Sequence, residues 1–441
     1  MAKEVSLLPP PFADAAEQRL GDNPALNRTS QRSFENPSAS LGDRWARPLV
    51  MQVLKRMQDG GLIVCEREVE RRVGRLTDGG GEPVLRVDDP RFYRRVLLGG
   101  SLGFAEAYLD GDWSTDDLPA LLQVLARNMA AAYRVDRGPA RLIEPLRRFG
   151  HWLRRNTRSG SRRNIAAHYD LSNEFFALFL DDTMTYSSGV FEHERATLRD
   201  ASVAKYDRIC RKLQLKPSDH LLEIGTGWGG MAIHAASQYG CRVTTTTISK
   251  QQFQFASQRI ARAGLQGRIT LLAEDYRDLS GQYDKLVSIE MIEAVGHQYL
   301  PVYFRKCSDL LKPDGMMGLQ AITIPDHRYE GYRRSVDFIR RYIFPGGCLP
   351  CTGTIGRSLR QTDLQVVHWE DFGPDYARTL AYWRANFQAN LDRIRALGYP
   401  ETFLRMWDFY LSYCEAGFRE RLTGVSQIVL TKPLCRREPL R

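Results

Sequence analysis

Three glycines, Gly225, Gly227 and Gly229, follow a short apolar run at residues 221–224. Glycine has no Cβ and adopts positive φ at little cost, so this turn lets backbone N–H groups approach a ligand closely. A helix that starts near Gly230 would direct its free N–H groups and the positive end of its dipole into the same space. The pattern predicts a strand, a ligand-binding turn and a helix, with a purely structural turn as the alternative.

Segments typical of strands and helices alternate through the rest of this region. We expect strands at 241–247, 269–272, 283–289 and 316–324, and helices at 231–239, 250–263 and 302–311. This alternation predicts an α/β fold with a doubly wound, mostly parallel sheet. Ligands of such sheets bind outside the carboxyl ends of the strands, where the glycine turn, Thr247 and Asp275 all lie.

The glycine spacing argues against a nicotinamide cofactor. The turn reads Gly-x-Gly-x-Gly instead of Gly-x-Gly-x-x-Gly, and the second strand ends at Thr247 without an acid to hold a ribose. A small adenosyl ligand without a pyrophosphate suits the short turn better. Asp275 is then placed to accept a hydrogen bond from an adenine amino group.

Composition indicates a globular protein with phosphate-bearing partners. The 441 residues carry a formal net charge of +10, mostly from an excess of arginine. No apolar run approaches the roughly 18 residues of a membrane span, and the N-terminus does not read as a secretory signal. The eight cysteines are scattered, which favours reduced cytosolic thiols, and the Cys348-x-x-Cys351 pair lacks further metal ligands nearby.

We divide the chain into four parts. Residues 1–45 are predicted to be a disordered tail, 46–130 a small α+β domain, 131–163 a basic amphipathic linker and 164–441 the catalytic domain. Residues 134–163 contain ten arginines against two acids, interleaved with an apolar stripe. Such a helix is typical of a membrane interface, although an interdomain helix with solvated arginines has the same pattern.

Several motifs resemble the cyclopropane-fatty-acyl-phospholipid synthases. They are Glu223-Ile-Gly-Thr-Gly-Trp-Gly-Gly230, Thr247-Ile-Ser-Lys-Gln-Gln252, His168-Tyr-Asp-Leu-Ser-Asn173 and, most specifically, residues 338–350 with the sequence FIRRYIFPGGCLP. Residues 89–108 resemble the N-terminal domain of that family, and the likeness covers about 80–435. It implies the class I methyltransferase fold and the use of S-adenosylmethionine.

The resemblance also assigns residues. Tyr186 and Ser187 would contact the carboxylate region of the cofactor, Gly225 and Gly227 its amino-acid part, and Ile248 and Gln252 its ribose side. Glu293 would help to hold a bicarbonate base, with Tyr376 as its partner. The remaining candidate cofactor-binding residues are Glu223, Trp228, Gly229, Thr247, Asp275 and Tyr276, and the remaining candidate catalytic residues are Ser188, Gln320 and Cys414. Neither set includes a metal ligand.

This sequence departs from the family pattern at three positions. Ser188 and Gln320 replace a cysteine and a histidine, and Ala294 replaces the histidine that follows the family's glutamate. The backbone N–H of Ser188 and the amide of Gln320 can still donate to an anion. Aromatic side chains suit the carbocation of this chemistry, with Tyr342, Phe344, Tyr376 and Tyr410 as candidates.

The implied reaction is methylene transfer to an unsaturated acyl chain of a membrane phospholipid, giving a cyclopropane. The alternatives are a methylene- or methyl-branched product, a lipid-binding protein without turnover, and an RNA methyltransferase. We see no RNA-binding module of known pattern, so we expect an anionic bilayer and no nucleic acid as partner. We therefore expect the protein to be cytoplasmic and peripherally associated with the inner face of the membrane. The sequence leaves open whether it forms a homodimer.

Overall fold

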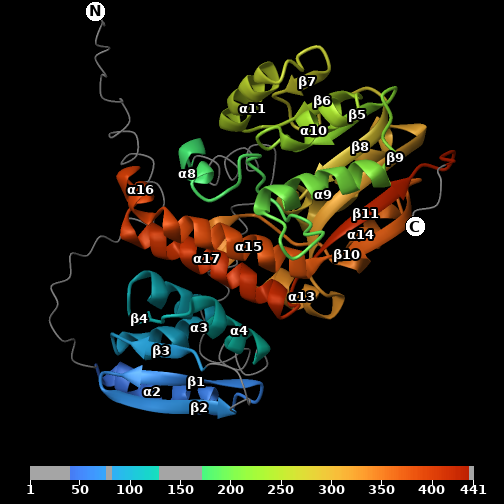
Figure 1. The fold of residues 1–441 in the computed structure, drawn as a ribbon. Helices are drawn as coiled ribbons and strands as arrows, with labels where there is room; N and C mark the ends of the chain where they lie inside the picture. Colours follow the sequence, from blue (N-terminus) through green and yellow to red (C-terminus); the bar gives the residue numbers. More distant parts are fainter. Residues whose placement is uncertain (1–39, 76–81, 129–170, 437–441) are drawn as a thin grey trace, which may run out of the picture.

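The computed structural model describes residues 40–75, 82–128 and 171–436 (Figure 1). The predicted linker at 131–163 and most of the predicted tail lie outside these residues. The first described helix, α2, spans Leu41–Leu54, so residues 41–45, which were predicted as tail, are helical. The Ser40 Oγ accepts from the Asp43 N–H, and the Asp43 carboxylate accepts from the Ser40 N–H. This capping box begins the helix earlier than the apolar pattern indicates.

The N-terminal domain is a four-stranded sheet with three described helices packed around it. The sheet has the order β2-β1-β3-β4, with β1 and β3 parallel and the other neighbours antiparallel. Helix α3 is kinked at Gly100, which is non-helical with φ of +59°, so the element consists of two helical stretches. The element bounds are β1 Gly60–Glu66, β2 Val69–Arg75, β3 Val84–Val87, α3 Arg91–Leu109, β4 Trp113–Ser114 and α4 Leu118–Arg127.

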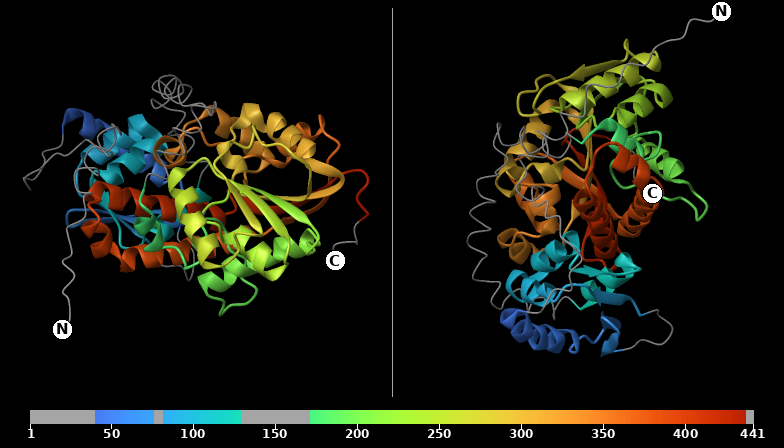
Figure 2. Two further views of the ribbon diagram at one scale, coloured as in Figure 1. Left: turned by 90° about the horizontal axis from the view of Figure 1, so that it is seen from above. Right: turned by 90° about the vertical axis from the view of Figure 1, so that its left-hand side faces the viewer.

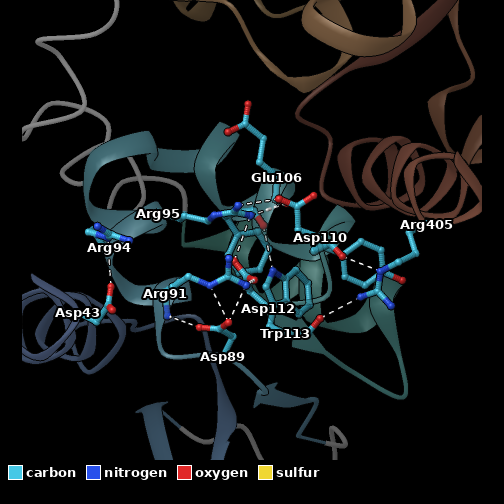
Figure 3. Close-up of polar contacts among 12 residues, drawn as sticks. Asp43, Asp89, Arg91, Arg94, Arg95, Glu106, Asp110, Asp112, Trp113 and Arg405 are labelled. Carbon is cyan, nitrogen blue, oxygen red and sulfur yellow. Dashed lines mark hydrogen bonds and ion pairs between the residues drawn. The ribbon is translucent and has the colours of Figure 1, made fainter. Parts of the chain in front are cut away.

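An ion-pair network holds the start of α3 against the β4 end of this domain (Figure 3). Arg91 bridges Asp89 at 2.6 Å and Asp112 at 2.8 Å, while Arg95 reaches Asp112 at 3.1 Å. Asp112 is fully buried, and burial raises its pKa to about 6 even with these two cations beside it. The network therefore depends on both arginines, because removing either would leave a buried charge with less compensation.

The larger domain contains the predicted doubly wound sheet. Its seven strands have the order β10-β11-β9-β8-β5-β6-β7, and β11 runs antiparallel to both of its neighbours. The predicted strands match the observed ones within a few residues, except that β9 begins earlier. The bounds are β5 His220–Ile224, β6 Arg242–Thr246, β7 Ile269–Leu272, β8 Tyr283–Ile289, β9 Leu311–Thr323, β10 Gln365–Asp371 and β11 Gly424–Thr431.

Consecutive strand residues face opposite sides of this sheet, and each side has its own core. Leu221 and Val287 pack with residues of α9, α10 and α11, whereas Leu222 and Leu286 pack with residues of α12 and α14. Strands buried on both faces read as nearly continuous apolar runs, which is the pattern of residues 221–224 apart from Glu223. The helix bounds are α9 Leu198–Lys212, α10 Gly230–Gln238, α11 Lys250–Arg262, α12 Leu300–Leu310 and α14 Thr352–Leu359.

Two long helices, α15 (Gly373–Ala389) and α17 (Glu401–Arg419), lie between the N-terminal domain and the large sheet (Figures 1 and 2). The Arg405 guanidinium on α17 donates to the carbonyls of Tyr108 and Trp113, at 2.6 and 3.1 Å (Figure 3). Within the described ranges, no helix has the length and apolar character needed to cross a bilayer. The remaining elements are α8 Asn173–Ala177, η2 Ile292–Ala294, η3 His297–Tyr299, α13 Asp326–Arg334, η4 Ile339–Ile343 and α16 Leu391–Ala396.

Candidate active site

The predicted glycine turn lies at the carboxyl end of β5. The N–H groups of Gly225 and Thr226 both donate to the Thr246 carbonyl, at 3.1 and 3.0 Å, which ties the turn to β6. Gly227 has φ of +53°, and a Cβ built there would meet no atom within 4 Å. Gly229 caps the N-terminus of α10. The turn therefore leaves space beside Gly227 that only a residue without a side chain keeps open.

Glu223 lies buried beneath this turn. Its carboxyl accepts a hydrogen bond from Thr245 Oγ1 at 2.6 Å, and Thr245 Oγ1 also contacts Thr226 Oγ1 at 2.7 Å. Burial raises the pKa of Glu223 to about 8. At neutral pH the folded protein consequently favours the protonated form of this carboxyl.

The ends of β6 and β7 supply the next predicted residues. Thr247 Oγ1 donates to Gln252 Oε1 at 2.9 Å, and Ile248 lies between them in the chain. The Asp275 carboxylate accepts from Arg277 Nε at 2.8 Å and Nη2 at 2.6 Å. These contacts fix the side chains at the edge of the sheet where the sequence placed an adenosyl ligand.

A segment before α9 forms the opposite wall. Tyr186 Oη is 2.8 Å from Tyr410 Oη, and Ser187 Oγ accepts from Lys205 Nζ at 2.6 Å. Lys205 has no exposed surface, and burial lowers its pKa to about 8. Trp228 Nε1 reaches across from the glycine turn to Asn173 Oδ1 at 2.7 Å. Predicted cofactor residues from distant parts of the chain thus meet at one place.

Glu290, the residue directly after β8, lies at the centre of the predicted catalytic residues. Its Oε1 accepts from the Ser188 N–H at 2.9 Å and from Gln320 Nε2 at 2.8 Å. Its Oε2 accepts from Tyr376 Oη at 2.7 Å. Three of the predicted anion ligands therefore bind a carboxylate that belongs to the chain itself.

Glu293 does not take part in this arrangement as the sequence predicted. Tyr376 was expected to be the partner of Glu293, but it donates to Glu290, and Glu293 Oε1 accepts from the Ile322 N–H at 2.6 Å. Burial, and then the nearby Glu290 charge, raise the pKa of Glu293 to about 8. Among the described residues, its buried Oε2 has no hydrogen-bond partner.

A cavity of about 1520 Å³ connects these groups. All of the predicted cofactor residues except Gly229 line it, and so do Glu290, Glu293, Tyr376 and Cys414. Ser188 and Gln320 lie behind Glu290 and are fully buried. Burial raises the pKa of the Cys414 thiol well above its usual range, so this residue is not an activated nucleophile.

The predicted aromatic wall is partly wrong. Phe344, Tyr376 and Tyr410 line the cavity, but Tyr342 does not. Tyr342 Oη instead donates to Glu106 of the N-terminal domain at 2.6 Å. Tyr342 therefore belongs to the contact between the domains. The sequence pattern could not distinguish this position from one in the wall of the active site.

The residues present fit S-adenosylmethionine. The open space at Gly227, the free N-terminus of α10 and the polar groups at the ends of β5, β6 and β7 suit a small adenosyl ligand with an amino-acid end. When bound, this ligand supplies an electrophilic methyl group. In the part of the chain that the structure describes, no group of three His, Cys, Asp or Glu residues could hold a metal. Fold and site define a class I methyltransferase that uses S-adenosylmethionine.

Comparison with known proteins places the chain more closely. Residues 156–428 match the model of the mycolic acid cyclopropane synthetase family. The chain is 41% identical to the tuberculostearic acid methyltransferase UfaA1 of Mycobacterium tuberculosis, over 90% of this chain and 98% of the relative. It is 38% identical to the cyclopropane-fatty-acyl-phospholipid synthase of Escherichia coli K12, over 83% and 92%.

A solved structure agrees with this placement. Mycolic acid cyclopropane synthase CmaA1, complexed with SAH and CTAB, superimposes with a TM-score of 0.59 at 34% identity, over 62% of this chain and 98% of that structure. The chain belongs to the mycolic acid cyclopropane synthetase family. It is an S-adenosylmethionine-dependent methyltransferase of the cyclopropane-fatty-acyl-phospholipid synthase type.

The sequence interpretation missed two charged residues of the site, Glu290 and Lys205. An acid directly after a buried strand was a usable signal for Glu290, because the carboxyl ends of the strands carry the ligand site. Lys205 gave no signal, because a lysine on an amphipathic helix is ordinarily solvated.

Proposed function

We propose that the protein transfers a methylene group from S-adenosylmethionine to the double bond of an unsaturated acyl chain in a membrane phospholipid, forming a cyclopropane fatty acid. The observation that supports this most is the extent of the cavity. It runs from the glycine turn past Glu290 and Tyr376 and on into the N-terminal domain. A methyl donor and a long acyl chain could therefore meet inside one continuous cavity.

The part of the cavity that enters the N-terminal domain is lined mainly by apolar side chains. Phe338 and Phe409 line it on the catalytic side, and Val50, Leu85 and Leu122 line it on the side of the N-terminal domain. An apolar channel stabilises a hydrocarbon chain by burying its surface, but offers few partners to a nucleotide. This favours an acyl substrate over RNA.

Aromatic rings stand where positive charge would develop. The alkene attacks the methyl group and leaves a carbocation on the neighbouring carbon. Tyr376, Tyr410 and Phe344 line this part of the cavity, and ring faces attract cations through their quadrupole. The same rings exclude water, which would otherwise capture the cation.

Basic residues of α13 support a phospholipid as the form of the substrate. His327, Arg328 and Arg334 line the same cavity, and the Arg334 side chain is 65% exposed. A guanidinium at a cavity wall suits a phosphate group. The name of the Escherichia coli relative, a cyclopropane-fatty-acyl-phospholipid synthase, agrees with a phospholipid substrate. With a net charge of +10, the protein would act at an anionic membrane surface from the cytoplasmic side.

A methyl- or methylene-branched product is the second candidate. UfaA1, to which the chain is 41% identical, is named as a methyltransferase and not as a cyclopropane synthase. Both outcomes share the methyl transfer and the carbocation. They differ in the fate of the cation, so the product decides between them.

Incubation with labelled S-adenosylmethionine and vesicles of an unsaturated, anionic phospholipid tests the proposal. We expect label in the acyl chains, and none in matched vesicles with saturated chains. Label in bulk RNA would support an RNA methyltransferase. Binding to vesicles without any transfer of label would support a lipid-binding protein.

A further inference from the structure

The donors that the sequence assigned to a bicarbonate are all used by a side chain. The Ser188 N–H, Gln320 Nε2 and Tyr376 Oη donate to the Glu290 carboxylate at 2.9, 2.8 and 2.7 Å. A carboxylate and a bicarbonate present the same planar pair of oxygens, so both anions would need the same donors. A second anion there would also be repelled by the first. Bicarbonate therefore does not fit this site.

The backbone at Glu290 indicates that the side chain is required. Its φ is +49°, in the left-handed region that favours glycine. The Glu290 N–H donates to the Gln320 carbonyl at 2.8 Å, which holds the residue in this conformation. A non-glycine residue with positive φ stores strain, and such residues cluster at functional sites.

The surrounding charges select Glu290 over Glu293 as the ionised carboxylate. Three hydrogen bonds and the buried Lys205 ammonium stabilise the charged form of Glu290, although burial still raises its pKa above the ordinary value. Glu293 Oε1 accepts a hydrogen bond from the Ile322 N–H, and burial raises the pKa of Glu293 to about 8. A carboxylate that accepts three hydrogen bonds is held in a fixed orientation, which suits it to remove a proton.

Glu290 also faces the space in which the reaction would occur. It lines the cavity beside Tyr376, Tyr410 and the glycine turn. Oε2 has a single described donor, Tyr376, and a carboxylate oxygen has two lone pairs, so one can accept a proton.

We propose that Glu290 is the built-in base of the reaction and takes the place of a bicarbonate. The inference rests on the proposed function and adds the group that completes it. The alkene carbon bonds to the methyl carbon as the C–S bond breaks, and its electron pair stays on sulfur. Glu290 then takes a proton from the new methyl group, and the C–H electron pair bonds the methyl carbon to the cationic carbon, which closes the ring.

Glu290→Gly is the decisive variant. Glycine suits the positive φ, so the variant should fold, and it exposes the three donors to an added anion. In buffer freed of bicarbonate we expect its turnover to fall by about 10²- to 10⁴-fold, with unchanged binding of S-adenosylhomocysteine by calorimetry. Added bicarbonate or formate should restore part of the activity in a saturable manner.

Two further variants complete the design. Glu290→Gln keeps the space filled, so neither anion should restore its activity. Arg67→Gly, at another position with positive φ (+56°) in the β1–β2 turn, controls for the backbone effect and should behave as wild type. The wild type should not respond to removal of bicarbonate.

Four results would overturn the inference. They are a wild type that needs bicarbonate, a Glu290→Gly variant with wild-type turnover, the loss of its S-adenosylhomocysteine binding, and the failure of both anions to restore it. A wild type that transfers no methyl group to any lipid would instead contradict the proposed function, and the inference with it.

Discussion

Replacing Tyr376 by phenylalanine should slow turnover by roughly 10- to 100-fold. Tyr376 Oη donates to Glu290 Oε2 at 2.7 Å, and a hydrogen bond to a charged group contributes about 1.5–3 kcal/mol. Each 1.36 kcal/mol of barrier is about tenfold in rate. The Tyr376 ring is buried and stacks on Phe418 with centroids 4.4 Å apart, so the phenylalanine ring should keep its place.

The same variant should also change the pH dependence of turnover. A base must be deprotonated, so the rate rises with pH through the pKa of Glu290. Removing a donor to the carboxylate disfavours the charged form and raises this pKa further. The low-pH limb of the kcat profile should therefore move to higher pH.

The assay is kcat against pH with unsaturated vesicles. Tyr382→Phe, on the same helix, α15, is the matched control and should leave both rate and profile unchanged. A Tyr376→Phe variant with the rate and profile of wild type would refute the assignment of Glu290.

Three further predictions concern the ligand loop, the second carboxyl and the membrane. Gly227→Val should abolish binding of S-adenosylhomocysteine in calorimetry, because its side chain would fill the open space and strain a residue with φ of +53°; unchanged affinity would contradict the loop assignment. The free energy of unfolding of Glu293→Gln should rise relative to that of wild type between about pH 5 and 8, by up to about 1.4 kcal/mol per pH unit. The reason is that the raised folded-state pKa of Glu293 makes folded wild type hold a proton that its unfolded chain releases, so only wild type loses stability as pH rises. Thermal midpoints that differ equally at both pH values would argue against a protonated Glu293. Replacing four arginines by glutamine should weaken sedimentation with anionic vesicles at low salt, and equal binding to neutral vesicles would contradict the electrostatic account; the four are Arg147, Arg148, Arg154 and Arg155.

The fold followed from the sequence because its strands are buried on both faces. Runs such as residues 221–224 are therefore apolar apart from Glu223, and the turns after them carry glycine or acids. The N-terminal domain was less predictable. Strand β2, with the sequence VERRVGR, is mostly exposed and shows no alternation, so only its pairing with β1 makes it a strand.

The site was predictable where its residues adjoin the strands and not where tertiary contacts decide. The glycine turn, Thr247 and Asp275 were found by position. The hydrogen-bond partner of Tyr376 could not be predicted in this way, because the side chains of Glu290 and Glu293 both follow β8. The backbone at Glu290 has φ of +49°, and it is the Glu290 carboxylate that accepts from the tyrosine. Tyr342 was misassigned because its contact with Glu106, which is distant in the chain, cannot be predicted from the sequence.

Methylene transfer is tested most directly by the fate of the methyl carbon. Vesicles of an unsaturated phospholipid would be incubated with the protein and ¹³C-methyl S-adenosylmethionine, and the acyl chains examined by NMR. We predict label in a ring methylene with high-field protons. Label in a vinylidene or methyl carbon would establish the branched product, and acyl chains without label would contradict the proposed function.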